Sequence, residues 1–300
     1  FPYTTLFRSK HFEEFGLDEQ MSNELHNHIQ YDISEAATLP RDLVLPSTTI
    51  DDLTNKLYEI LDKELYQTLI MPSEVTSNDE PIAVIGLNCR LPGGAVNPEE
   101  YWKVLVEGKE GVREIPPERW DIDSYYDPDP NKPGKMNTRK GGFIDNIDHF
   151  DADFFGISPR EAEFMDPQQR LLLEVSYESL LSSGISPKSL RGSSTGVFLG
   201  ICTHDYMDLI TSTGDKRLIS PYMATGNFAS TATGRISYFF DFHGPNFAID
   251  TACSSSLVAI DQACEALRGG KANLALAGGV HLILSPDLSI DFTKAGMLAP

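Results

Sequence analysis

The 300-residue sequence contains few cysteines and no long apolar run. None of its four cysteines forms a Cys-x-x-Cys pair, which excludes a zinc or redox site of that form and a dense disulfide framework. No apolar run approaches the roughly 18 residues of a membrane span, and the N-terminus lacks the basic start and apolar centre of a secretory signal. We therefore expect a cytoplasmic protein that works in a reducing compartment and is not bound to a membrane.

Basic residues are also scarce, with 24 lysines and arginines against 44 aspartates and glutamates, for a net charge of -20. Such a charge repels phosphate backbones and anionic headgroups, so we expect no nucleic-acid or membrane-surface partner. The charge is uneven: residues 1–80 have 16 acids and 5 bases, whereas residues 81–300 have 28 acids and 19 bases. This difference predicts two units.

We divide the chain into four segments. Residues 1–10 fit neither a helix nor a strand and are interpreted as a non-native leader, and residues 11–62 read as a small acidic helical unit. Residues 63–80 read as a linker, because they end in a polar stretch with turn formers and little to bury. Residues 81–300 form the main unit.

The main unit alternates short β-branched runs with helical patterns, which predicts a largely parallel, buried sheet in an α/β fold. A strong helix begins at Asp166, with Pro167 at its first position, Leu171, Leu172, Val175 and Leu180 on its buried side, and Gly184 after its end. The predicted strands are Pro81–Gly86, Thr195–Ile201, Phe247–Asp250 and Leu274–Leu284.

Cys253 lies in the stretch DTACSSSL (residues 250–257), between a predicted strand and a predicted helix. We expect that helix to pack through one face, formed by Leu257, Ile260, Cys264 and Leu267. Backbone amides at a helix N-terminus stabilise a thiolate and can donate hydrogen bonds to an oxyanion, so Cys253 is a candidate nucleophile. Location alone leaves open that Cys253 is a buried apolar cysteine, as we expect Cys264 to be.

Five stretches resemble, in order, the β-ketoacyl synthase (ketosynthase) domains of modular polyketide synthases, and the match covers nearly all of residues 81–300. The stretches are PIAVIGLNCRLPGG at 81–94, HFDADFFGISPREAEFMDPQQRLLLEV at 149–175, GVFLGICTHDY at 196–206, ATGNFASTATGRISYFFDFHGPNFAIDTACSSSL at 224–257, and LALAGGVHLILSPDLSIDFTKAGMLAP at 274–300.

The resemblance implies a thiolase-like α-β-α-β-α sandwich of two similar halves, with this chain as the first half. It implies that Cys253 accepts an acyl chain and that a decarboxylated malonyl-type extender then attacks the acyl carbonyl. The two family histidines that promote decarboxylation belong downstream of the segment matched at 274–300. We therefore expect the chain to be truncated before them, inactive in condensation on its own, and prone to aggregate through exposed apolar surface.

The resemblance also implies the partners, which are acyl carrier domains, an acyltransferase domain and a second copy of the chain. The homodimer would form partly through the strand that leads to Cys253. No cofactor is expected in the ketosynthase itself, since the 4'-phosphopantetheine arm belongs to the partner carrier. Two alternatives remain open: an inactive fragment or pseudo-enzyme that only docks partners, and a condensing enzyme of the fatty-acid type (3-oxoacyl-ACP synthase).

The segment HFEEFGLDEQMSNEL, together with the later TLPRDLVLPSTTIDDLTNKLYEIL, resembles the latter part of an acyl carrier domain. Its predicted helices are Asp18–Gln30 and Thr49–Leu61, and Gly16, Leu17 and Asp18 agree with the carrier motif. The serine that carries phosphopantetheine in that family is replaced here by Glu19. We therefore expect an inactive carrier, and a plain acidic helical linker is the alternative.

Overall fold

The computed structural model describes residues 11–32, 39–57, 59–60 and 80–299. The predicted leader and nearly all of the predicted linker lie outside these residues, so both stay predictions. Within the described residues, no helix is long and apolar enough to cross a bilayer.

The helical unit near the N-terminus forms the two predicted helices. The 3-10 helix η1 (Phe12–Phe15) precedes α2 (Glu19–Asp32), and residues 50–57 and 59–60 are also helical. Each helix has a side-chain cap: the Asp18 carboxylate accepts from the Met21 amide, and the Thr49 hydroxyl accepts from the Asp52 amide. Buried Phe12, Leu39, Leu43 and Val44 form its core.

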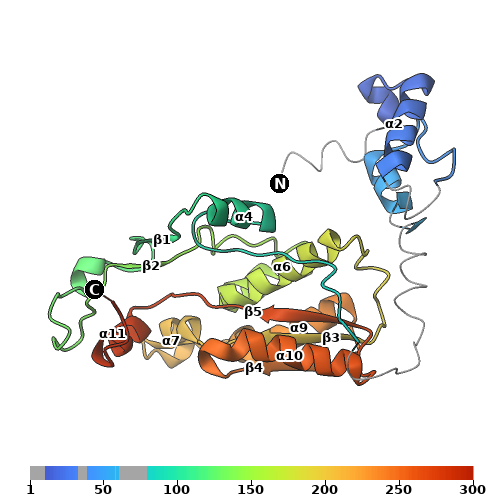
Figure 1. The fold of residues 1–300 in the computed structure, drawn as a ribbon. Coiled ribbons are helices and arrows are strands. Elements are labelled where there is room, and N and C mark those ends of the chain that lie inside the picture. Colours follow the sequence, from blue (N-terminus) through green and yellow to red (C-terminus); the bar gives the residue numbers. More distant parts are fainter. Residues whose placement is uncertain (1–10, 33–38, 58, 61–79, 300) are drawn as a thin grey trace.

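Three parallel strands form the central sheet of the main unit, in the order β4-β3-β5 (Figure 1). Strand β3 (Thr195–Gly200) is the middle strand and is buried along its whole length. It pairs with β4 (Asn246–Ile249) on one side and with β5 (Leu274–Gly279) on the other. The predicted parallel pairing is confirmed, but burial holds only for β3, because the residues of β4 and β5 are partly or fully exposed; β5 also ends before the expected Leu284.

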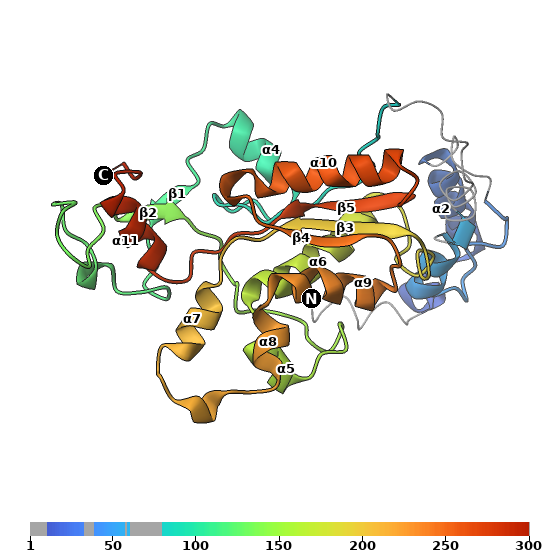
Figure 2. The same cartoon turned by 90° about the horizontal axis from the view of Figure 1, so that it is seen from below.

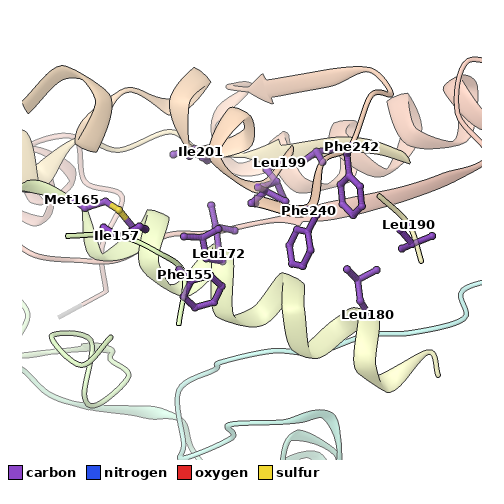
Figure 3. Close-up of a cluster of buried hydrophobic side chains, with 14 of the residues drawn as sticks. Phe155, Ile157, Met165, Leu172, Leu180, Leu190, Leu199, Ile201, Phe240 and Phe242 are labelled. Carbon is purple, nitrogen blue, oxygen red and sulfur yellow. The ribbon is translucent and has the colours of Figure 1, made fainter. Parts of the chain in front are cut away.

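Helices α6 (Pro167–Ser182) and α9 (Ala229–Phe240) cover one face of the sheet, as Figure 2 shows. The predicted start of α6 is confirmed. The helix begins at Pro167, and the carboxylate of Asp166 before it accepts from the Gln168 backbone amide. Figure 3 shows the main core between these layers. Its members include Leu172, Leu180, Leu199, Ile236, Phe240 and Phe242.

Helix α10 (Ser255–Arg268) covers the opposite face of the sheet (Figure 2), but only in part through the predicted side chains. Leu267 packs on the sheet and Cys264 is partly buried as expected, whereas Leu257 is 69% exposed and Ile260 47% exposed, so the prediction was wrong for these two residues. The buried face carries Ser255, Ala259, Ala263 and Ala266, and its alanines pack with Phe198. Small side chains let the helix axis approach the sheet closely, and this close approach decides which face turns inward.

The predicted first strand, Pro81–Gly86, is also wrong, because this segment is not a strand and Val84 is 81% exposed. The segment runs past the end of α6 instead. The Leu87 amide donates to the Ser182 hydroxyl, which in turn donates to the Leu87 carbonyl. A side chain at Gly86 would lie 2.6 Å from the Ser179 carbonyl oxygen, so glycine permits this close contact.

The remaining elements surround this three-layer body. They are α4 (Pro98–Val106), β1 (Val112–Glu114), η2 (Ile122–Ser124), β2 (Lys140–Gly142), α5 (Pro159–Phe164), α7 (Asp205–Thr211), η3 (Lys216–Leu218), α8 (Tyr222–Asn227), η4 (Ala252–Ser254) and α11 (Asp287–Lys294). Strands β1 and β2 pair antiparallel in a separate small sheet.

Candidate functional site

The carboxyl ends of β3, β4 and β5 meet at one edge of the sheet because the three strands are parallel. Ligand and catalytic sites of open α/β sheets form at such an edge. The segments that leave the strands there carry Cys202 after β3, Cys253 after β4 and His281 after β5. The edge therefore gathers chemically active side chains that are far apart in the sequence.

Cys253 lies in the turn between β4 and α10, at the predicted position. The turn begins where the Asp250 carboxylate accepts a hydrogen bond from the Ala252 amide at 3.0 Å. Ala252 then adopts φ 55°, in the left-handed region that non-glycine residues seldom occupy. This bend turns the chain sharply into η4 and then into α10, and the side chain of Cys253 is exposed. The reading of Cys253 as a sealed, buried cysteine is wrong.

Ser255 holds the two ends of this turn together. Its hydroxyl accepts from the Thr251 amide at 2.9 Å and donates to the Ala252 carbonyl at 2.7 Å. The side chain is 5% exposed, so water does not compete for these bonds. Two satisfied hydrogen bonds at a buried hydroxyl stabilise the left-handed conformation at Ala252, which on its own would cost about 1–2 kcal/mol.

The N-terminus of α10 has no cap from the side chain at its N-cap position. Ser254 occupies that position, but its hydroxyl bonds to the carbonyl and hydroxyl oxygens of Thr251 instead. The amides of the first turn of a helix carry partial positive charge, equivalent to about half an elementary charge. The Ser255 amide donates to the Ala252 carbonyl, so the helix start favours an anion near Cys253 through its dipole rather than through that amide.

Two glycines let the first turn of α10 lie directly on the ends of the strands. A β-carbon at Gly200 would lie 2.8 Å from both the Ser255 β-carbon and the Ser256 nitrogen. A β-carbon at Gly279 would lie 3.0 Å from the Ser256 β-carbon. Any larger residue at Gly200 would push α10 outward, so this glycine sets the position of the turn that carries Cys253.

The neighbouring thiols have environments that differ from that of Cys253. Burial raises the pKa of Cys202, and the charges of Asp250 and Cys253 raise it further. Burial also raises the pKa of Cys89, which lies near the end of α6. Cys264 lies further along α10 and is partly buried. Of the four cysteines, Cys253 is the exposed one.

Two buried polar residues, Asp166 and Gln168, lie behind this edge, and the sequence analysis did not identify them as part of the site. The side-chain nitrogen of Gln168 donates to the Thr203 carbonyl at 3.2 Å, and its side-chain oxygen accepts from the Leu282 backbone amide at 3.2 Å. Gln168 thereby ties the segments after β3 and β5 to the start of α6. Burial raises the pKa of Asp166, which accepts from the Gln168 amide group as well. The only sequence signal was the position of both residues at the start of a buried helix.

The carrier-like unit does not fit a phosphopantetheine arm. Glu19, at the expected attachment position, is exposed at the first residue of α2, so the position is accessible but has no hydroxyl. Ser22 lies about one turn further along, and its side chain is only 2% exposed. Neither residue offers an accessible hydroxyl for attachment.

Comparison with known proteins gives a consistent result. Residues 79–300 match the family model described as "Beta-ketoacyl synthase, N-terminal domain". Polyketide synthase GfsB of Streptomyces halstedii is 42% identical to the chain over 302 residues, which cover 98% of this chain and 5% of that protein. The pikromycin polyketide synthase component PikAII of Streptomyces venezuelae is 43% identical over 291 residues, which cover 96% of this chain and 8% of that protein.

A solved structure agrees in fold. The oxazolomycin ketosynthase domain OzmH KS7 of Streptomyces albus JA3453 superposes with a TM-score of 0.68 at 38% identity, over 73% of this chain and 37% of that chain. The α-β-α layers described above are thus the first half of a thiolase-like sandwich. The chain spans about a third of this ketosynthase and at most 8% of the two curated relatives.

Proposed function

The chain belongs to the β-ketoacyl synthase family, as part of the ketosynthase domain of a polyketide synthase, and on this premise we propose that it accepts an acyl group on the sulfur of Cys253. The observation that carries the proposal is the exposed thiol of Cys253 in the strained turn that starts α10. A cysteine at such a place is reachable by a large thioester and lies beside the N-terminus of a helix, whose dipole favours a thiolate.

The first step is an exchange of thioesters. The Cys253 thiolate attacks the carbonyl carbon of an acyl thioester on an upstream carrier, a new carbon–sulfur bond forms, and the carrier thiol leaves with the bonding electrons and takes up a proton. Negative charge develops on the carbonyl oxygen during this attack, and amides at the start of α10 are placed to stabilise it.

The second step completes a decarboxylative Claisen condensation. A malonyl-type extender on a second carrier loses carbon dioxide, and its carbanion attacks the acyl-cysteine carbonyl, which releases the Cys253 thiolate and forms a β-ketoacyl thioester. The resemblance assigns the promotion of decarboxylation to two histidines that are not in the segments matched here. The share of the reaction proposed for residues 79–300 is therefore acyl acceptance.

The proposal includes the partners that this chemistry needs. The acyl donor and the extender are thioesters on the phosphopantetheine arms of acyl carrier domains, and an acyltransferase domain loads the extender. Glu19 cannot carry such an arm, so the carriers are other domains than residues 11–62. A synthase of the fatty-acid type would use the same first step, but the relatives reported above are polyketide synthases.

We also propose a homodimer built along β4. This strand is at one end of the three-strand order, so its outer backbone edge is not paired with another strand among the described residues. Phe247 on this strand is 53% exposed, and Tyr238 on the adjacent α9 is 89% exposed. An unpaired edge with exposed aromatic residues favours pairing with a second copy.

Light scattering tests this dimer by comparing the molar mass of Phe247→Glu with that of the unchanged chain. We expect a smaller mass for the variant, and an equal mass for both proteins contradicts the proposal.

Acyl loading tests the proposed nucleophile without the rest of the reaction. The chain is incubated with the N-acetylcysteamine thioester of a short acyl group, and its intact mass is measured. We expect one added acyl group on the unchanged chain, none on Cys253→Ala, and normal loading on Cys264→Ala, a control on the helix that follows the turn. Loading that persists in Cys253→Ala overturns the proposal.

Alkylation separates an acyl-accepting site from a docking module without chemistry. Burial disfavours the thiolate at Cys89 and Cys202, so iodoacetamide should modify Cys253 at least about tenfold faster than either. Equal rates at the three cysteines would favour the docking alternative.

A further inference from the structure

Cys202 lies beside the candidate nucleophile although the two are far apart in the sequence. Side chains along a strand alternate between its two faces. On β3, Phe198 packs with alanines of α10, and a side chain at Gly200 would touch Ser255 of α10. Leu199 and Ile201 belong to the core on the opposite face. Cys202 continues the series of Phe198 and Gly200, which places it on the α10 side of the sheet.

The backbone keeps this alternation past the end of β3. The Ile201 amide donates to the Ile249 carbonyl at 3.1 Å, so the parallel ladder with β4 extends to the residue before Cys202. Paired strands lie about 4.8 Å apart, and disulfides join α-carbons about 5.5 Å apart. The register of Gly200 with Ile249, continued along both chains, sets Cys202 level with Thr251, two residues before Cys253, so the two cysteines leave the sheet on neighbouring segments.

Electrostatics agrees with this placement. The charge of Cys253 is one of the three influences that raise the pKa of Cys202, together with burial and the charge of Asp250. The other two cysteines lie elsewhere: Cys264 is on α10, eleven residues after Cys253 and about 16 Å from it, and Cys89 follows Asn88, which bonds to Glu178 at the far end of α6. Cys202 is thus the thiol placed to react with Cys253.

We propose that Cys202 is a resolving thiol that forms a reversible disulfide with Cys253 when hydrogen peroxide oxidises the site. The inference rests on the proposed reactivity of Cys253. The Cys253 thiolate attacks one peroxide oxygen, which breaks the O–O bond, releases hydroxide that is protonated to water, and leaves a sulfenic acid. The Cys202 sulfur then attacks that sulfenic sulfur, and the S–O bond breaks with release of a second water. In balance, two thiols and one peroxide give one disulfide and two waters.

This disulfide would protect the nucleophile from permanent loss. A sulfenic acid without a nearby thiol is oxidised by more peroxide to the sulfinic acid, which thiols do not reduce. The disulfide stops this progress, blocks acyl loading while it lasts, and is reduced again by a dithiol. Peroxide can reach the pair because Cys253 is exposed and Cys202 is partly exposed.

The test treats the chain, Cys202→Ser and Cys264→Ser with hydrogen peroxide and compares intact masses before and after dithiothreitol. The chain and Cys264→Ser should lose about 2 Da, give a linked peptide pair containing Cys202 and Cys253, and recover acyl loading on reduction. Cys202→Ser should gain about 32 Da at Cys253 and stay unable to load. Without peroxide, Cys202→Ser should load normally, which shows that it is folded.

The outcomes distinguish this inference from the function that it rests on. A sulfinic acid at Cys253 in the chain and in Cys202→Ser alike overturns the resolving role and leaves the nucleophile in place. A disulfide that links other cysteines, or that joins two chains, overturns it as well. A Cys253 that neither loads nor oxidises refutes both proposals.

Discussion

Replacing Gly200 by alanine tests whether the end of β3 sets the position of the nucleophile. The new β-carbon would lie 2.8 Å from the Ser255 β-carbon and 2.8 Å from the Ser256 nitrogen. Ordinary contact starts at 3.4 Å, so strand and helix must separate by about 0.6 Å. Two of the three nearest atoms belong to the backbone of α10 and cannot turn away, so the whole first turn has to move.

Overpacking of this kind costs about 1–3 kcal/mol. The alanine also lowers the entropy of the unfolded chain, which offsets about 0.4–1 kcal/mol. We therefore expect Gly200→Ala to reduce the free energy of unfolding by about 1–2 kcal/mol. Displacement of a reacting group by 1 Å can cost a hundredfold in rate, so a shift of 0.6 Å should slow acyl loading of Cys253 by about tenfold.

Gly278→Ala is the matched control on the neighbouring strand. Its β-carbon would meet only Leu199, at 3.9 Å, which is ordinary contact. Urea unfolding gives the free energies, and intact mass against time gives the loading rates. We expect Gly278→Ala to match the unchanged chain in both measurements. If Gly200→Ala also matches it in both, the close contact of β3 with α10 does not set the position of Cys253 and the reasoning is refuted.

Three further predictions concern packing and charge. Leu257→Ser should change the free energy of unfolding by less than about 0.5 kcal/mol, whereas Ala259→Val, on the buried face of α10, should cost about 1–3 kcal/mol in the same urea experiment. Burial raises the pKa of Asp166 above its ordinary 3.8, so the folded state binds that proton more tightly than the unfolded state. The protonated Asp166 therefore stabilises the folded state below pH 3.8, and this stabilisation is lost as the pH rises through the raised pKa. In Asp166→Asn the free energy of unfolding should therefore fall less steeply with rising pH than in the unchanged chain. Equal slopes of unfolding free energy against pH in the two proteins would contradict this. Arg235→Met removes the 2.6 Å ion pair between Arg235, whose side chain is 13% exposed, and Glu161, whose side chain is 24% exposed. The free energy of unfolding, measured by heat or urea, should fall by about 2 kcal/mol. A loss below about 0.5 kcal/mol would show that solvent screens the pair.

The strand, turn and helix around Cys253 could be predicted because local signals agree there. A short apolar run, a row of small residues and a helical pattern follow one another within residues 247–268. The cap at Asp166 and the start of α6 were predicted for the same reason, since Asp-Pro is a local signal for a helix N-terminus. Structure that depends on residues adjacent in the sequence could therefore be predicted.

The packing face of α10 was not predictable from hydrophobicity. Leu257 and Ile260 are more apolar than the alanines, yet Ala259 and Ala263 face the sheet. The choice depends on how closely the helix approaches β3, and hence on Gly200, 55 residues before Ser255. The strand prediction for residues 81–86 was wrong for a similar reason, since their composition suits a strand but the chain there runs past the end of α6, where the next residue, Leu87, bonds to Ser182.

The neighbourhood of Cys202 and Cys253 also depends on pairing between distant segments. Each cysteine follows a strand, and the order β4-β3-β5 makes those strands neighbours. Parallel strands end at the same edge of a sheet, but the adjacency of these two ends requires the strand order, which no local pattern contains.

The hydrogen bond from the Thr251 amide to the buried Ser255 hydroxyl gives the turn an intrinsic reporter. That amide proton exchanges with deuterated water only when the bond opens, so its exchange rate measures how often the turn around Cys253 loosens. Any event that strains the turn, including acylation of the sulfur, will appear as faster deuterium uptake at this single amide.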